Sequence, residues 1–161
     1  MHSHLHYVPF IYGLVRSELL GQLQSLQNRA LKHCYKLPFL TPTKTLFQTH
    51  AKSTLPISGI THLSSSVLLH KIRIGRVETN TKPAMKFSNL RSSGDFVAAT
   101  FNSDYLKRDI HYHGVQIYNK IPNEIRKLTD IDKFKKDLKQ YLLARSQRLV
   151  KPSKFSLLQL S

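Results

Sequence analysis

LQSLQNRALKHCYKLPFLTPTKTLF, residues 23–47, predicts a helix, a stop and a second helix. Pro38 ends the first helix, because a proline disfavours the helical conformation of the residue before it. Thr41 and Pro42 suit the cap and the first position of a second, short helix that reaches about His50. Working outward, apolar residues recur three or four positions apart, so we expect a helix over 15–37 whose buried face holds Leu19, Leu23, Leu26, Ala30, Cys34 and Leu37.

The opposite face of this first helix is basic. Arg29, Lys32 and Lys36 lie on it at helical spacing, with no acid among them. A lysine-rich helix face is often only solvated surface. We favour contact with a polyanion, because the basic faces of this chain lack the acidic partners four residues away that a solubility face carries.

Two later helices are expected to carry similar faces. One runs from Ile57 to about Ile74 and gathers cations in its last turns, where they suit the negative end of the helix dipole. The other begins at Asp130, whose side chain caps it, and runs to about residue 145. Together the three basic faces supply the candidate nucleic-acid contacts Arg29, Lys32, Lys36, Lys71, Arg73, Arg76, Lys135, Lys136 and Lys139.

A polar stretch separates the two helical parts. Residues 78–104 contain Pro83 and Gly94 and no sustained period, which predicts a linker or long loop with a short extended piece at 96–101. We therefore expect a helical block over 1–77, the linker over 78–104, a second helical block over 105–145 and a basic flexible tail over 146–161. The low count of 6 glycines and the Leu-rich and Lys-rich runs place the fold in the mainly α class.

Charge is the strongest global signal. Lys and Arg number 25 against 9 Asp and Glu, a formal net charge of +16. Both halves share the excess, so a basic tail on a neutral body is excluded. A field of this sign attracts polyanions, of which nucleic acid is the commonest, with an anionic membrane surface as the rival. The sequence has no apolar run long enough to span a membrane and no signal-peptide pattern, so we expect an intracellular protein, nuclear or cytoplasmic and not secreted.

The sequence offers little for catalysis. Phosphate-binding glycine loops and the usual nucleophile and metalloprotease motifs are absent. Asp130 and Asp132 are the only close pair of acids, and capping of a helix N-terminus explains them better than a pair of metal ions does. Cys34 is the only cysteine, which excludes an intramolecular disulfide, and we expect it in the core as a small apolar residue.

Two short histidine tracts raise the question of a metal site. His2, His4 and His6 alternate, as do His111 and His113, and alternation places ligands on one side of an extended strand. Neither Cys nor acid joins them locally, and short histidine tracts are nonspecific. We therefore assign no metal site, no catalytic residue and no cofactor.

Five segments carry a resemblance to a known family. In chain order they are SHLHYVPFIYG (3–13), LQSLQNRALKHCYKLPFLTPTKTLF (23–47), STLPISGI (53–60), GVQIYNKIPNEIRKL (114–128) and FKKDLKQYLL (134–143). This order resembles the C-terminal region of reverse transcriptases from non-LTR (LINE-type, jockey-like) retrotransposons. That family closes on W-N-x-L-P-x-x-I-R and F-K-x-x-L-K-x-Y-L, and Tyr118 stands here where the family has Trp.

The resemblance implies a helical, thumb-like block that grips the backbone of a template–primer duplex without reading its sequence. The palm, with its Y/F-A-D-D aspartates and bound Mg²⁺, has no counterpart among these residues. We therefore expect a non-catalytic fragment of an RNA-directed DNA polymerase that binds RNA or DNA backbone and partners a reverse transcriptase palm. Two alternatives stay open: a helical protein-interaction module or non-functional transposon-derived reading frame, and an enzyme that brings the histidines together with Asp104 or Asp109.

The position of Met1 in the family pattern gives a first prediction. Met1 falls where a family member would be mid-chain, so we expect a truncated copy. The genomic DNA upstream of codon 1 should encode, intact or broken, a palm with two adjacent aspartates after an aromatic residue. Translation of that DNA in all frames checks this, and an ordinary promoter without such a frame would contradict the fragment hypothesis.

Overall fold

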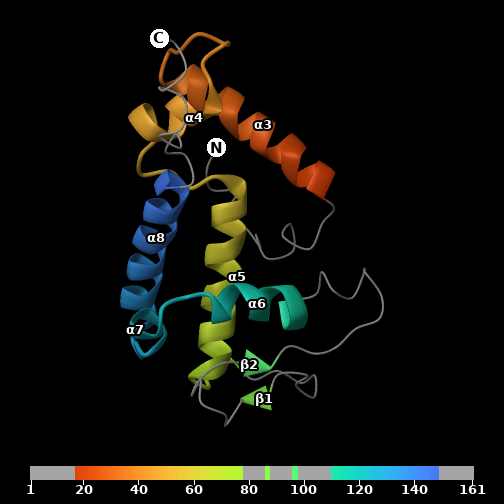
Figure 1. Ribbon diagram of the computed structural model, residues 1–161, viewed down its shortest axis with the longest axis vertical. Coiled ribbons are helices and arrows are strands. Elements are labelled where there is room, and N and C mark those ends of the chain that lie inside the picture. The colour runs from red at the N-terminus through yellow and green to blue at the C-terminus, as the bar shows by residue number, and fades with distance from the viewer. Residues whose placement is uncertain (1–16, 78–85, 88–95, 98–109, 149–161) are drawn as a thin grey trace, which may run out of the picture.

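The computed structural model describes residues 17–77, 86–87, 96–97 and 110–148 (Figure 1). The fold is mainly α, as predicted. The first 16 residues, most of the predicted linker over 78–104 and the tail from residue 149 lie outside the described residues. The described elements are α3 Ser17–Cys34, α4 Thr43–Thr45, the π-helical turn η1 Leu46–His50, α5 Ile57–Arg73, β1 Lys86–Phe87, β2 Phe96–Val97, the π-helical turn η3 Ile110–Gly114, α6 Val115–Asn119, α7 Asn123–Arg126 and α8 Ile131–Arg148.

Helix α5 is the centre of the fold. Helices α8, α6 and α3 all pack against it, and α8 runs beside it in the opposite direction (Figure 1). One core cluster therefore combines residues from both predicted helical blocks: Leu55, Ile57, Ile60, Leu63, Leu69, Phe96, Val115, Tyr118, Ile121, Phe134, Leu138 and Leu142. The two predicted blocks are therefore separate in the sequence but share one core.

A stack of rings joins α5, α6 and α8 inside this core. The ring of His70 lies parallel to that of Phe134, with 3.7 Å between centroids and 3° between planes. The hydroxyl of Tyr118 hydrogen-bonds Nδ1 of His70 at 2.9 Å. All three side chains are fully buried, so the apolar contacts and the hydrogen bond both form away from water.

The buried face of α3 differs from the one predicted. Leu26 is 59% exposed, and Leu19 and Cys34 are also exposed. Leu23 faces inward as predicted, but the residues that face inward beside it are Leu20 and Leu31. The prediction was wrong because α3 carries two overlapping apolar stripes, and the choice between them depends on what packs against the helix rather than on its own period.

Glutamines on the inner side of α3 explain which stripe is buried. The side-chain amide of Gln27 donates to the carbonyl of Leu55 at 2.9 Å. The side-chain oxygen of Gln24 accepts from the backbone N–H of Ile57 at 2.8 Å, which is one of the free amides at the start of α5. These bonds fix α3 against the N-terminus of α5 and satisfy groups that burial would otherwise leave unpaired.

The ends of α3 and α5 share one geometry. In each, the second residue past the cap donates its N–H to the carbonyl five residues back: Leu37 to Lys32 at 2.9 Å and Arg76 to Lys71 at 2.9 Å. Such an end needs a left-handed residue, which is Gly75 in α5 but Lys36, at φ 52°, in α3. The first helix thus ends at Cys34 and not at Leu37, and Lys36 lies outside it.

Beyond Lys36, α3 leads into a small second cluster. Leu31, Leu46 and Ala51 are buried there, with Leu37 and Phe47 packed against them. The predicted cap at Thr41 is wrong. Its hydroxyl donates to the carbonyl of Pro38 at 2.7 Å, and no side chain caps α4.

The C-terminal half follows the predicted pattern more closely. Asp130 caps α8, since its carboxylate accepts from the N–H of Asp132 at 3.0 Å. The extended piece predicted at 96–101 begins as strand β2, which pairs antiparallel with β1, Phe87 opposite Phe96. The side chain of Asn119 hydrogen-bonds the backbone of Phe96 in β2. Its amide nitrogen donates to the Phe96 carbonyl at 2.8 Å, and its oxygen accepts from the Phe96 N–H at 3.2 Å.

Two leucine substitutions test this packing. Leu138→Ala should lower the free energy of unfolding by about 2–5 kcal/mol, because it empties a fully buried position. Leu26→Ala should change it by less than about 0.5 kcal/mol, since the side chain is already exposed. Urea unfolding followed by circular dichroism measures both. Equal losses would mean that α3 is buried on the face first predicted.

Candidate nucleic-acid interface

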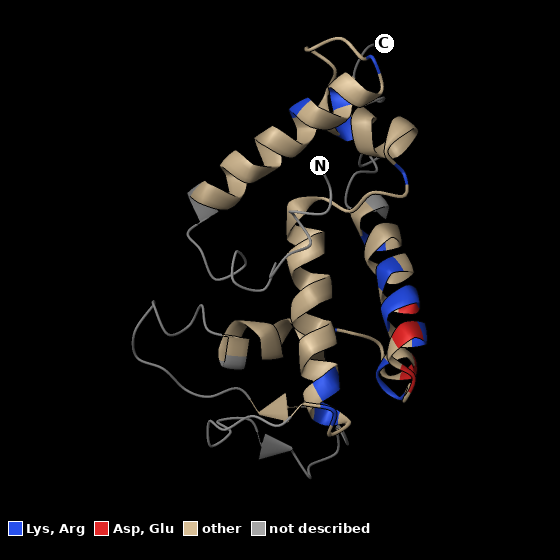
Figure 2. Ribbon diagram, turned by 180° about the vertical axis from the view of Figure 1, so that it is seen from behind, with Lys and Arg blue, Asp and Glu red and all other residues tan. Residues whose placement is uncertain are grey.

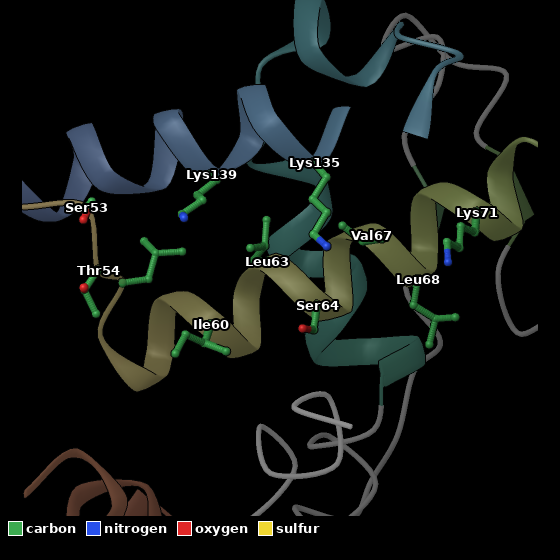
Figure 3. Close-up of a pocket in the computed structure, with 11 residues that line it drawn as sticks. Ser53, Thr54, Ile60, Leu63, Ser64, Val67, Leu68, Lys71, Lys135 and Lys139 are labelled. Carbon is green, nitrogen blue, oxygen red and sulfur yellow. The ribbon is translucent and has the colours of Figure 1, made fainter. Parts of the chain in front are cut away.

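A groove lies between α5 and α8 (Figure 3). Its volume is about 640 Å³. Apolar side chains of α5 form its floor, and hydroxyl and ammonium groups stand around them. The lining residues are Ser53, Thr54, Leu55, Ile60, Leu63, Ser64, Val67, Leu68, Lys71, Lys135 and Lys139, and no Asp or Glu is among them.

Three of the nine predicted contacts meet at this groove. Lys71 comes from α5, while Lys135 and Lys139 come from α8. The two α8 lysines are four residues apart, so they share a helix face, and both extend toward α5 (Figure 3). The antiparallel packing of α5 and α8 therefore brings together cations that are more than sixty residues apart in the sequence.

The predicted contacts of α3 form a separate group at its C-terminal end (Figure 2). Arg29 is exposed on the helix, and Lys36 is exposed on the turn that follows it. Lys32 is half-buried: its ammonium donates to the carbonyl of Phe39 at 2.7 Å and lies 5.5 Å from the centre of the Phe39 ring. Only Arg29 and Lys32 thus remain on the predicted helical stripe.

Two of the remaining predicted contacts lie at the end of α5. Nη1 of Arg73 donates to the carbonyl of Arg126 at 3.0 Å and lies 3.4 Å from the hydroxyl of Tyr118. Arg73 thereby ties α5 to α6 and α7, and it is less free than the flexible phosphate contact that was expected. Arg76 is exposed just past the helix end.

On α8 the charge pattern is more mixed than expected. Asp132 precedes Lys136 by four residues, and Asp137 follows Lys133 by four. The expectation that the basic faces lack such partners is therefore wrong for this helix, and Figure 2 shows acids and bases interleaved along it. Lys136 is exposed and does not line the groove. Of the predicted contacts on α8, Lys135 and Lys139 are the two that line the groove together with Lys71.

Sequence reasoning missed a second gathering of basic groups. The charges of His113, Lys120 and Arg145, which lie on three other segments of the chain, act on His62 in α5. Burial first, and then the positive charge of these neighbours, lowers the pKa of His62 to about 4. No sequence signal links these residues, because each is a single basic residue on a different segment.

Burial also shifts the pKa values of the ring stack toward the neutral forms. Burial lowers the pKa of His70, against an opposing effect of the Leu128 backbone, and Arg73 lowers it further. Burial raises the pKa of Tyr118. The stack therefore contributes packing and a hydrogen bond to the core. The charge of the groove comes from the lysines that line it.

The buried histidines make stability depend on pH. The unfolded chain binds a proton at His62 near pH 6.5, whereas the native chain does so only near pH 4. Stability should therefore fall as pH drops from about 6.5 to about 4, by on the order of 3 kcal/mol at most for His62. His62→Gln should flatten this decline in urea unfolding, with the exposed His33→Gln as the control. An equal slope in both variants would contradict the buried, neutral state of His62.

Among the residues that the structure describes, no group of three His, Cys, Asp or Glu side chains is arranged to hold a metal ion. Within the same ranges, no helix is long and apolar enough to cross a membrane. No protein-family model, no curated protein and no solved structure matches this chain.

Proposed function

We propose that this chain binds the phosphate backbone of RNA or DNA across the groove between α5 and α8. The observation that carries the proposal is the meeting of Lys71, Lys135 and Lys139 on a groove whose lining holds no carboxylate. Among the side chains that the structure describes, none of these lysines has an acid within ion-pair distance. Their charge is therefore available to a ligand.

The rest of the lining suits a backbone better than a small anion. Ser53, Thr54 and Ser64 supply hydroxyl donors, which contact phosphate and sugar oxygens in many nucleic-acid complexes. The lysines come from two helices along an elongated groove, and flexible ammonium groups accept a row of phosphates without fixed geometry. Such contacts position a polynucleotide and do not read its sequence, so binding should show little sequence preference.

The wider charge supports the same ligand. Residues 19–77 contain eight Lys and Arg and no Asp or Glu. A region without acids raises the local concentration of polyanions and speeds their association. Phosphate contacts release condensed counterions, so the affinity should fall steeply with salt.

We further propose that the chain derives from the thumb and post-thumb region of a non-LTR retrotransposon reverse transcriptase and is itself non-catalytic. The support is the order of the five segments, together with the place of two of them in the fold. Tyr118 belongs to the Y-N-x-I-P segment, and Phe134 and Leu138 belong to the F-K-x-x-L-K segment. All three are fully buried core residues, so the matching positions are those on which the packing depends.

A helical protein-interaction module is the second candidate. Leu19 and Leu26 are exposed and seven residues apart, so they lie on one face of α3. An apolar helix face in solvent is typical of a surface that meets another protein, such as a reverse transcriptase palm. Co-purification with a palm that is lost in Leu26→Asp, without loss of fold, would favour this candidate.

A charge-matched pair of variants tests the groove. Lys135→Ala with Lys139→Ala should flatten the slope of log K against log salt by about two units, one for each lost phosphate contact. Lys127→Ala with Lys133→Ala removes the same charge from exposed positions outside the groove and should leave the slope unchanged. Fluorescence anisotropy on a blunt RNA duplex measures both. Equal slopes in the two double variants would show that the groove lysines are only solvated surface.

A further inference from the structure

The turn between α3 and α4 presents two large apolar side chains to solvent. Phe39 is 70% exposed and Leu40 is 90% exposed. The backbone around them is well fixed: the N–H of Thr41 donates to the carbonyl of Pro38 at 3.0 Å, and its hydroxyl donates to the same oxygen at 2.7 Å. The ammonium of Lys32 holds the next carbonyl, that of Phe39, at 2.7 Å. The apolar tip is therefore displayed on an ordered turn.

Cations surround this tip. Arg29, Lys32, Lys36 and Lys44 all belong to the α3–α4 unit, and Figure 2 shows the basic segments gathered at this end of α3. Lys32 lies 5.5 Å from the centre of the Phe39 ring, so one side of the ring carries a positive charge. Because the side chain is mostly exposed, the other side of the ring is open to a ligand.

We infer that Phe39 stacks on an unpaired base of the bound nucleic acid. A flat aromatic ring beside flexible cations is the combination by which proteins hold unpaired nucleotides: the ring stacks on the base and the cations contact the flanking phosphates. Lys32 takes part in both contacts. Its ammonium lies over the Phe39 ring, and its charge attracts the phosphates that flank the stacked base.

An anionic membrane would also attract an apolar tip with a basic collar. The position of Lys32 argues against it, because inserting the Phe39 ring into hydrocarbon would carry the ammonium on its face toward hydrocarbon as well. A stacked base imposes no such desolvation, since its phosphates stay near the ammonium. A polynucleotide is therefore the occupant that fits both the ring and the charge.

The location of the turn fits the proposed function, on which this inference rests. Ala51 belongs to the small cluster that anchors α3 and η1, and Ser53 and Thr54 line the groove just beyond it. In the sequence, only a few residues therefore separate the cluster next to the turn from the lining of the groove. If one polynucleotide occupies both surfaces, we expect its duplex part in the groove and its unpaired end at the turn.

Two RNA probes separate the two surfaces: a blunt duplex, and the same duplex with a short unpaired overhang that carries 2-aminopurine. Wild-type chain should bind the overhang probe more tightly, by about tenfold, with a change in 2-aminopurine fluorescence. Phe39→Ala should abolish that advantage and the fluorescence change, yet bind the blunt duplex as wild type does. Phe39→Trp should keep the advantage, and Leu26→Ala, which removes another exposed apolar side chain of α3, should behave as wild type.

Each other outcome has a clear meaning. If Phe39→Ala binds both probes as wild type does, the inference is overturned while the groove proposal stands. If no variant binds the blunt duplex but Phe39 still governs binding to the overhang, the groove proposal fails and the inference survives. If Phe39→Ala loses binding only to phosphatidylserine vesicles, the turn is a membrane contact and the inference is overturned. Thermal melting of each variant, expected to match wild type, excludes unfolding as the cause.

Discussion

The stack of His70 on Phe134, capped by the hydroxyl of Tyr118, is the contact on which the rest of the structure depends. It lies where α5, α6 and α8 meet, and it joins His70 to residues 48 and 64 positions later in the chain. The hydroxyl of Tyr118 satisfies one ring nitrogen of His70 at a site that excludes water, which offsets part of the cost of burying this polar ring. By fixing α8 antiparallel to α5, the stack also helps to place Lys135 and Lys139 on the groove that Lys71 lines.

Sequence periodicity predicted the helices well where one apolar stripe dominates. In α5 and α8 the stripes of Ile57, Ile60 and Leu63 and of Phe134, Leu138 and Leu142 are the ones that the core uses. In α3 the leucines allow two stripes, and period alone could not choose between them. The choice is made by Gln24 and Gln27, whose partners lie 33 and 28 residues away and leave no trace in the local pattern.

The candidate site was predictable as a set of charges but not as an arrangement. Each basic residue is evident in the sequence, yet only the crossing of α5 and α8 decides that Lys71, Lys135 and Lys139 share a groove and that Lys136 does not. Likewise, the sequence shows Arg73 only as one more basic residue. In the structure, its bonds to Arg126 and Tyr118 join α5 to α6 and α7. The basic neighbours of His62 could not be found for the same reason, since three other segments of the chain supply them.

The two proposed binding surfaces gain from being held in a fixed relation. The α3–α4 turn belongs to the small cluster around Leu46, and the groove belongs to the main core, so a flexible joint between them would let each bind independently. The bonds from Gln27 to the Leu55 carbonyl and from Ile57 to Gln24 act against this, because they lock α3 to the start of α5 just where the groove begins. A preorganised pair of surfaces loses less conformational entropy when one polynucleotide bridges both. The glutamine contacts thus have a role in binding as well as in folding, although neither residue touches the proposed ligand.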